Sequence, residues 1–185
     1  MSEHTKGLGN GVETADRKKI EGLLGQLTPF DLREAEDIAC MRRYLACFDN
    51  LLTRQNTAMH LSSSSLILDE SGQNTLLCWH NIYRSWSWTG GHADGDADLL
   101  AVALREAQEE TGAVCRPFSQ PGAAAPLAFD ILPVWAHEKR GRAVAAHLHL
   151  NFTFLLQAGQ TAPGAGTSPP HTGQLLMMLR FSLKV

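Results

Sequence analysis

The sequence has no apolar run of about 18 residues, so it predicts no membrane-spanning helix. Its first thirty residues are largely polar and lack the apolar core of a secretory signal peptide. It also lacks an excess of basic residues, with 16 Lys and Arg against 19 Asp and Glu and a formal net charge of −3. Proteins that bind nucleic acids usually show a basic stripe. We therefore expect neither a membrane nor a nucleic acid duplex as a partner.

Cysteine is scarce and shows neither metal-finger nor redox spacing. The four cysteines are Cys40, Cys47, Cys78 and Cys115, and no two of them form a CxxC pair. Unpaired thiols of this kind are typical of proteins in a reducing compartment. We therefore expect reduced cysteines, with a disulfide as the weaker alternative, and a cytoplasmic location.

The composition is that of a folded domain with an extension. The chain has 185 residues, of which 44% are hydrophobic and 19% charged. We expect a helical N-terminal extension over residues 1–55, a domain over residues 56–157, and an atypical C-terminal tail, disordered or divergent, over residues 158–185. The tail opens with residues rich in Gly, Pro, Thr and Ser, and neither a further strand nor a closing helix is evident in it.

Two helices are predicted in the N-terminal extension. Apolar residues recur at helical spacing from residue 20 to residue 27 and again from residue 38 to residue 52. We expect the second helix to begin with Thr28 as N-cap, Pro29 in its first turn and Asp31 near its positive end. Both helices are interpreted as packing on the body that follows, and they also offer a surface for a homodimer.

The central part predicts strands, then one helix, then further strands, an order that favours a mixed sheet. The predicted strands are residues 65–68, 75–79, 86–88, 128–135 and 144–157. The helix is predicted at residues 98–111, with Asp96 or Asp98 near its start and Gly112 as its stop.

Histidines are secondary candidates for a role in binding. In the last predicted strand His147 and His149 alternate with leucines, so their imidazoles share one face of the sheet. They are candidates for contacts with phosphate or metal, although a plain polar face is the more common explanation. His92, next to Gly91, is a third candidate.

The predicted helix carries an unusual concentration of carboxylates. Glu106, Glu109 and Glu110 fall on one side of it, next to Arg105. Like charges at such spacing destabilise an isolated helix. One interpretation is a solvated face with Arg105 paired to Glu109, and the other is a site for divalent cations, which prefer oxygen ligands. The preceding Gly90 and Gly91 favour the second, because glycine allows the backbone to approach closely.

These residues resemble the Nudix box, GX5EX7REUXEEXGU, in which U is a bulky apolar residue. Gly91 matches its first glycine, and REAQEETGA, residues 105–113, matches its second half. The resemblance extends over about residues 50–157 and implies an α/β fold of Nudix type, an α/β/α sandwich around a mixed sheet with a helical N-terminal extension. It also implies hydrolysis of a nucleoside diphosphate linked to another group, with Mg²⁺ or Mn²⁺ as cofactor.

The resemblance implies roles for five residues. Glu109 and Glu110 would be metal ligands, and Glu106 a further ligand or the base that orients the attacking water. The Gly90 carbonyl is a candidate ligand, and Arg105 would hold the carboxylates in position. The catalytic residues expected are thus Glu106, Glu109 and Arg105, and the metal site Glu106, Glu109, Glu110 and Gly90.

Two departures from the family pattern support an alternative function. The box has a glutamate six residues after its first glycine, whereas this chain has Ala97, for which Asp96 or Asp98 is a partial substitute. The tail also departs from the usual end of the fold. The alternative is a non-catalytic Nudix scaffold that binds a nucleotide or a partner protein.

Overall fold

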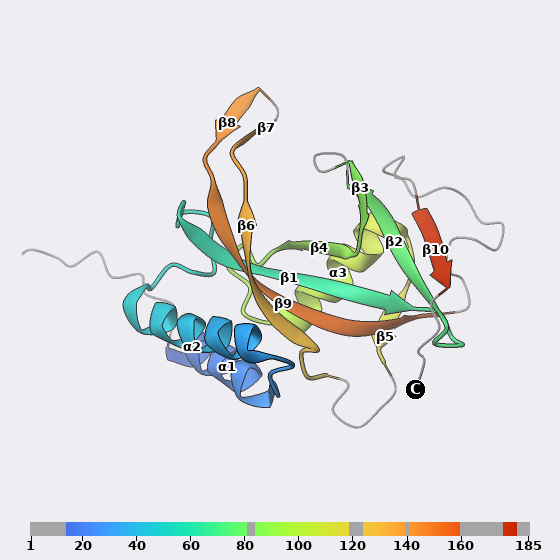
Figure 1. The fold of residues 1–185 in the computed structure, drawn as a ribbon, viewed down its shortest axis with the longest axis horizontal. Helices are drawn as coiled ribbons and strands as arrows, with labels where there is room; N and C mark the ends of the chain where they lie inside the picture. Colours follow the sequence, from blue (N-terminus) through green and yellow to red (C-terminus); the bar gives the residue numbers. More distant parts are fainter. Residues whose placement is uncertain (1–13, 81–83, 119–123, 140, 160–175, 181–185) are drawn as a thin grey trace, which may run out of the picture.

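The computed structural model describes residues 14–80, 84–118, 124–139, 141–159 and 176–180. Two helices, α1 (Thr14–Gln26) and α2 (Leu32–Cys47), lie together beside a twisted mixed sheet (Figure 1). A third helix, α3 (Leu99–Thr111), packs against the sheet strands β1 (Met59–Leu68) and β4 (Thr89–His92). The expected mixed-sheet α/β fold with N-terminal helices is confirmed.

The sheet is built around two parallel strands. β1 and β9 (His147–Ala158) pair in parallel over ten register positions, from Met59 with Leu148 to Leu68 with Gln157. Every other pairing is antiparallel, so the sheet is mixed. The remaining strands are β2 (Asn74–His80), β3 (Ser85–Ser87), β5 (Cys115–Pro117), β6 (Ala128–Val134) and β10 (Leu176–Arg180), and a separate hairpin of β7 (His137–Lys139) and β8 (Arg142–Val144).

The two faces of the central strands differ in character. Because side chains alternate along a strand, β9 sends Leu150, Phe152, Phe154 and Leu156 to one face, where all four are fully buried in the core. The opposite face is polar: Asn151 hydrogen-bonds Ser62, Ser64 and Thr153. The core therefore lies on one side of these strands, and a hydrogen-bonded polar layer lies on the other.

The second helix begins later and ends earlier than the sequence predicts. Its N-cap is Asp31 and not Thr28, because the Asp31 carboxylate accepts the Glu34 amide at 2.8 Å. The predicted stripe to residue 52 is also too long, since Phe48 is an extended C-cap. Leu51 and Leu52 leave the helix and still enter the core from the following turn.

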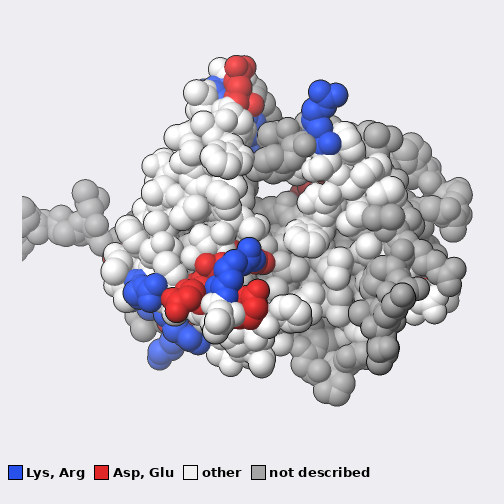
Figure 2. All heavy atoms as spheres, viewed as in Figure 1, with Lys and Arg blue, Asp and Glu red and all other residues white. Residues whose placement is uncertain are grey.

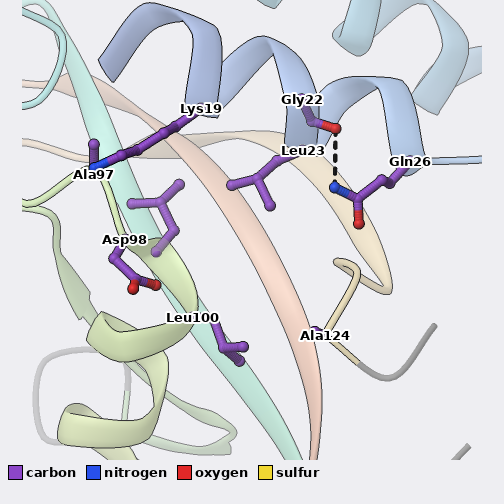
Figure 3. Close-up of a pocket in the computed structure, with 9 residues that line it drawn as sticks. Lys19, Gly22, Leu23, Gln26, Ala97, Asp98, Leu100 and Ala124 are labelled. Carbon is purple, nitrogen blue, oxygen red and sulfur yellow. Dashed lines mark hydrogen bonds between the residues drawn. The ribbon is translucent and has the colours of Figure 1, made fainter. Parts of the chain in front are cut away.

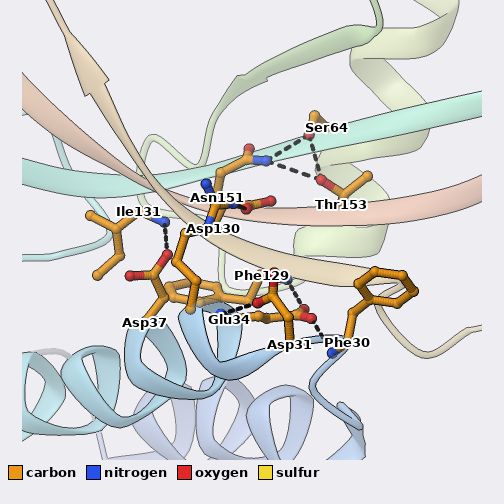
Figure 4. A network of polar contacts seen from close by, with 11 residues as sticks. Phe30, Asp31, Glu34, Asp37, Ser64, Phe129, Asp130, Ile131, Asn151 and Thr153 are labelled. Carbon is orange, nitrogen blue, oxygen red and sulfur yellow. Dashed lines mark hydrogen bonds and ion pairs between the residues drawn. The ribbon is translucent and has the colours of Figure 1, made fainter.

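Acidic side chains of α2 fasten the extension to the sheet edge (Figure 4). The buried Glu34 accepts the Phe129 amide at 3.0 Å and the Phe30 amide at 2.7 Å. Asp37 accepts the Ile131 amide at 3.2 Å. Edge strands expose backbone amides that need hydrogen-bond acceptors. The carboxylates of α2 are the acceptors for these amides of β6.

Charged side chains on this side of the molecule gather over the helical layer and at the tip of the β7–β8 hairpin (Figure 2). Arg33 and Asp130, 2.6 Å apart, connect α2 to β6 as an ion pair. The described helices include none long and apolar enough to cross a membrane. The four cysteines are free thiols, as expected.

The C-terminal tail contains a strand that the sequence did not reveal. Residues 176–180 form β10, which pairs antiparallel with β2 from Leu176 with Cys78 to Arg180 with Asn74. The expectation of no further strand is therefore wrong for this segment. Residues 1–13, 160–175 and 181–185 lie outside the described residues, and the domain boundaries stay a prediction.

Replacing Glu34 with alanine will test the attachment of α2. Glu34→Ala leaves the Phe129 amide of β6 without its charged acceptor, so the free energy of unfolding should fall by about 2–3 kcal/mol. Chemical denaturation measures this. Glu36→Ala, on an exposed position of the same helix, is the control and should change stability by less than about 0.5 kcal/mol. Equal effects of the two variants would contradict this role of Glu34.

Candidate active site

The glutamate-bearing helix has the ends that its sequence predicts. The Asp98 carboxylate caps α3 by accepting the Ala101 amide at 3.0 Å. Asp96 in turn accepts the Asp98 amide at 2.9 Å. At the other end Gly112 has a φ of 72°, the left-handed conformation that stops a helix and favours glycine. Residues at the two ends of α3 therefore account for where this helix begins and ends.

One side of α3 is buried against the sheet, and this sets the direction of the glutamate side chains on its other side. The buried residues are Leu99, Val102, Ala103, Ala107 and Thr111. Ala107, smaller than the usual box residue, has no exposed surface. Glu106 and Glu110 are half-buried beside this face, and Glu109 is exposed.

Two glycines of β4 allow close approach, one by α3 and the other by the neighbouring strand β1. A Cβ on Gly91 would overlap the carboxylate of Glu106. A Cβ on Gly90 would lie 2.8 Å from the Ser64 Cβ and 3.0 Å from the Ser63 carbonyl oxygen of the neighbouring strand. Both positions thus require a residue without a side chain, one for the site and one for the sheet.

The Glu110 carboxylate reaches the backbone of β4. The Gly90 amide donates a hydrogen bond to Glu110 Oε2 at 3.2 Å, so helix and loop are joined directly at the predicted site. The predicted role of Gly90 concerned its carbonyl. The amide is the group that contacts a site residue, and the role of the carbonyl stays a prediction.

If α3 presented a solvated face, Arg105 would pair with Glu109. Its guanidinium lies near other carboxylates instead. Its guanidinium lies 3.7 Å from Glu106 Oε1 and 3.9 Å from Asp96 Oδ2, and no ion pair with Glu109 is among those of the described residues. Asp96, not Asp98, is therefore the nearby acidic residue on this side. Arg105 thus lies beside Glu106, and its role in holding the carboxylates in position stays a prediction.

Burial makes the ionised carboxylates costly. Desolvation raises the pKa of Glu110 to about 7, against an ordinary value of 4.5, although the Gly90 amide lowers it in part. Desolvation, followed by the charge of Glu109, also raises the pKa of Glu106. Excess negative charge in a half-buried position is the electrostatic setting that a bound cation relieves.

The donor chemistry fits Mg²⁺ or Mn²⁺. These ions take oxygen ligands, and Mg²⁺ in particular uses one or two carboxylates together with water and substrate phosphates. The three glutamates are not gathered around one point, because within the described part of the chain only a histidine group meets that condition. The surface is hollowed between the β7–β8 hairpin and β3, with acidic atoms visible inside the hollow (Figure 2).

The extension covers the position where the box has its first glutamate. Ala97 is only 6% exposed, and it shares the lining of an open pocket of about 300 Å³ with Gly22 and Leu23 of α1 (Figure 3). A glutamate at this position would carry its charge into that junction of α1 and α3. Alanine there is consistent with the packing of α1, and Asp96 contacts Arg105 instead.

The secondary candidates come together at another place. His92 of β4 and His149 of β9 have ring centroids 5.0 Å apart. Both lie close to His60, which had not been predicted as a candidate. His147 lies close to His60 and His149. Only the parallel register of β1 with β9 reveals His60 as part of this cluster, since it sets His60 opposite His149.

Comparison with known protein families identifies the family of the chain. A model of the NUDIX domain matches residues 59–163, more than half of the chain. The chain therefore belongs to the Nudix family. Membership confirms the expected family and makes the chain a hydrolase that acts on pyrophosphate bonds in general.

Solved structures of the family are only distantly similar. A NUDIX-family hydrolase from Clostridium perfringens is 18% identical with a TM-score of 0.44, covering 65% of this chain and 81% of its own. An Ap4A hydrolase from C. elegans is 14% identical with a TM-score of 0.35, at 65% and 79% coverage. A MutT structure from work on Aliivibrio salmonicida and Vibrio cholerae is 11% identical with a TM-score of 0.36, at 66% and 80% coverage. No curated protein matches significantly. These likenesses assign neither substrate nor mechanism.

Alanine substitution of Gly90 and Gly91 will show which glycine the metal site requires and which one the sheet requires. Gly91→Ala displaces the Glu106 carboxylate, so we expect Mn²⁺ affinity to fall about 10- to 100-fold in a protein that still folds. Gly90→Ala presses on the backbone of β1 and should lower the free energy of unfolding by about 1–3 kcal/mol. Calorimetric titration and denaturation measure the two effects. Unchanged Mn²⁺ affinity in Gly91→Ala would contradict this assignment.

Proposed function

We propose that the chain hydrolyses the diphosphate bond of a nucleoside diphosphate linked to another group, with Mg²⁺ or Mn²⁺ bound by Glu106, Glu109 and Glu110. The observation that carries the proposal is the contact of α3 with β4, where the Gly90 amide binds Glu110 and Gly91 leaves room for Glu106. Two separate parts of the box, the glycines of β4 and the glutamates of α3, are thus in contact.

The proposed reaction breaks one P–O bond of the diphosphate and forms a new P–O bond to the oxygen of water. A divalent ion bound to these carboxylates would polarise phosphoryl oxygens, lower the pKa of water and neutralise charge on the leaving phosphate. The leaving oxygen departs with its electron pair on one phosphate product, and the other product gains the hydroxyl.

The chain's own residues supply positioning and a proton acceptor. The Arg105 guanidinium lies 3.7 Å from Glu106 Oε1 and orients this carboxylate, which packs on Gly91. Since burial raises its pKa, Glu106 is suited to accept a proton from the attacking water at a carboxylate oxygen. Its other proposed role is that of a further metal ligand. Positioning and electrostatics of this kind account for most catalysis of phosphoryl transfer.

Three finer expectations belong to this proposal. The substrate is a small nucleoside diphosphate derivative, and neither a nucleic acid duplex nor a membrane is a partner. The location is cytoplasmic, for which the free thiols are the supporting observation. A homodimer through the N-terminal helices stays a candidate assembly.

The decisive experiment is hydrolysis of a panel of nucleoside diphosphate derivatives with and without Mg²⁺ or Mn²⁺. Glu109→Gln removes one proposed ligand charge at an exposed position, so kcat/KM should fall by about two to four orders of magnitude while the fold is kept. Gln108→Ala, an exposed neighbour on the same helix, is the matched control and should retain activity.

The alternative function has a distinct outcome. A folded wild-type protein that binds nucleotide but shows no turnover with either metal would contradict the proposed reaction and favour the non-catalytic scaffold. Turnover that is independent of metal, or equal in Glu109→Gln and Gln108→Ala, would overturn the assignment of the glutamates.

A further inference from the structure

Histidines from three neighbouring strands converge on the polar side of the sheet. The ring centroids of His60, His92 and His149 lie 5.0–5.1 Å from one another. One ligand nitrogen from each of these three side chains lies within 4.8 Å of the other two. A fourth imidazole, His147, is stacked on His60 with centroids 4.9 Å apart.

His60 carries a buried nitrogen without a partner. Its side chain is almost fully buried, with 4% of the residue exposed, and Nδ1 lies 3.1 Å from the Asn56 carbonyl oxygen. A carbonyl only accepts, so Nδ1 carries the hydrogen and a neutral ring leaves Nε2 as a bare acceptor. Nε2 has no hydrogen-bond partner, which is costly for a buried polar atom. A metal ion would supply the missing contact.

Polar contacts also orient the imidazoles of His147 and His149. His147 Nδ1 lies 2.8 Å from the Ala145 carbonyl oxygen, and His147 Nε2 lies 3.3 Å from His149 Nε2. Metal-binding histidines typically donate their second ring hydrogen to a carbonyl or carboxylate in this manner, which fixes the tautomer.

The cluster is separate from the carboxylates of α3. His92 directly follows Gly91 on β4, and consecutive strand residues point to opposite faces. The side-chain direction of Gly91 leads to Glu106, hence towards α3. His92 therefore points away from α3, towards the face that it shares with Ser62, its register partner on β1. The backbone of β4 lies between the two groups of residues.

We propose that His60, His92 and His149 bind a divalent transition-metal ion, Zn²⁺ first, with His147 beside them as a fourth imidazole. Imidazole nitrogen favours zinc and its neighbours in the transition series, whereas Mg²⁺ prefers the oxygens of carboxylates. The site is thus chemically as well as spatially distinct from the proposed catalytic centre. It does not depend on the proposed hydrolysis.

The required rearrangement is small. Zn–N bonds of about 2.0–2.1 Å place tetrahedral ligands about 3.4 Å apart, which is close to the 3.3 Å between His147 and His149. The three ligand nitrogens lie within 4.8 Å of one another, so each pair must close by at most about 1.4 Å, within the reach of side-chain rotations. The bound ion would link β1, β4 and β9, and so hold in place the strand that carries Gly90 and Gly91.

The wild-type chain, stripped of metal, gives the first test. Titration with Co²⁺ should yield one nitrogen-rich tetrahedral site with strong visible absorption, and Zn²⁺ should displace it. Zn²⁺ at a hundredfold excess over its dissociation constant should raise the midpoint of thermal unfolding by about 5–10 °C. The absence of a tetrahedral Co²⁺ spectrum together with an unchanged midpoint would overturn the proposal without any variant.

Variants then locate the ion. His149→Gln and His60→Gln should each lower Zn²⁺ affinity at least about tenfold and weaken the Co²⁺ absorption. His137→Gln, outside the cluster, and Glu109→Gln, on α3, should leave both unchanged. Loss of the Co²⁺ spectrum in Glu109→Gln, or its retention in both cluster variants, would overturn the proposal. These readouts use no substrate, so their failure is distinguishable from failure of the proposed hydrolase reaction.

Discussion

The close contact of α3 with β4 is the constraint on which the candidate active site depends. Gly91 leaves the space that the Glu106 carboxylate occupies, and the Gly90 amide binds Glu110. A side chain at Gly91 would overlap the Glu106 carboxylate and displace it. The spacing of these glutamates on α3 makes them repel one another, and a bound cation would relieve that repulsion.

The N-terminal extension is part of the same body and influences the site. Glu34 and Asp37 bind backbone amides of β6, so α2 protects a sheet edge that would otherwise be open. α1 meets the start of α3 beside Ala97. The position that usually carries a glutamate is thereby used for packing, which explains in physical terms how this chain departs from the box while retaining Glu106, Glu109 and Glu110.

Features set by neighbouring residues were predictable, and features set by distant contacts were not. The ends of α3 follow from Asp98 and Gly112, which act within one helical turn. The start of α2 was misplaced because Thr28 and Asp31 are both good caps, and the contacts of Glu34 with Phe30 and Phe129 accompany the cap at Asp31. β10 was missed because its partner β2 lies about 100 residues earlier.

In the candidate site, too, features set by neighbouring residues were predictable and contacts between distant residues were not. The spacing of Arg105, Glu106, Glu109 and Glu110 identified the helix face, yet not that Arg105 would contact Glu106 and Asp96. The shared face of His147 and His149 was predicted from alternation alone. Their meeting with His60 required the parallel register between β1 and β9, which no local pattern encodes.

The most direct test of the central claim is a crystal structure of the wild-type chain with Mn²⁺, whose anomalous scattering locates the ion. We predict an Mn²⁺ peak within about 2.0–2.3 Å of carboxylate oxygens from Glu106, Glu109 or Glu110. A well-ordered α3 without such a peak, or Mn²⁺ bound only at the histidine cluster of β1, β4 and β9, would contradict the account of the glutamates as the metal centre.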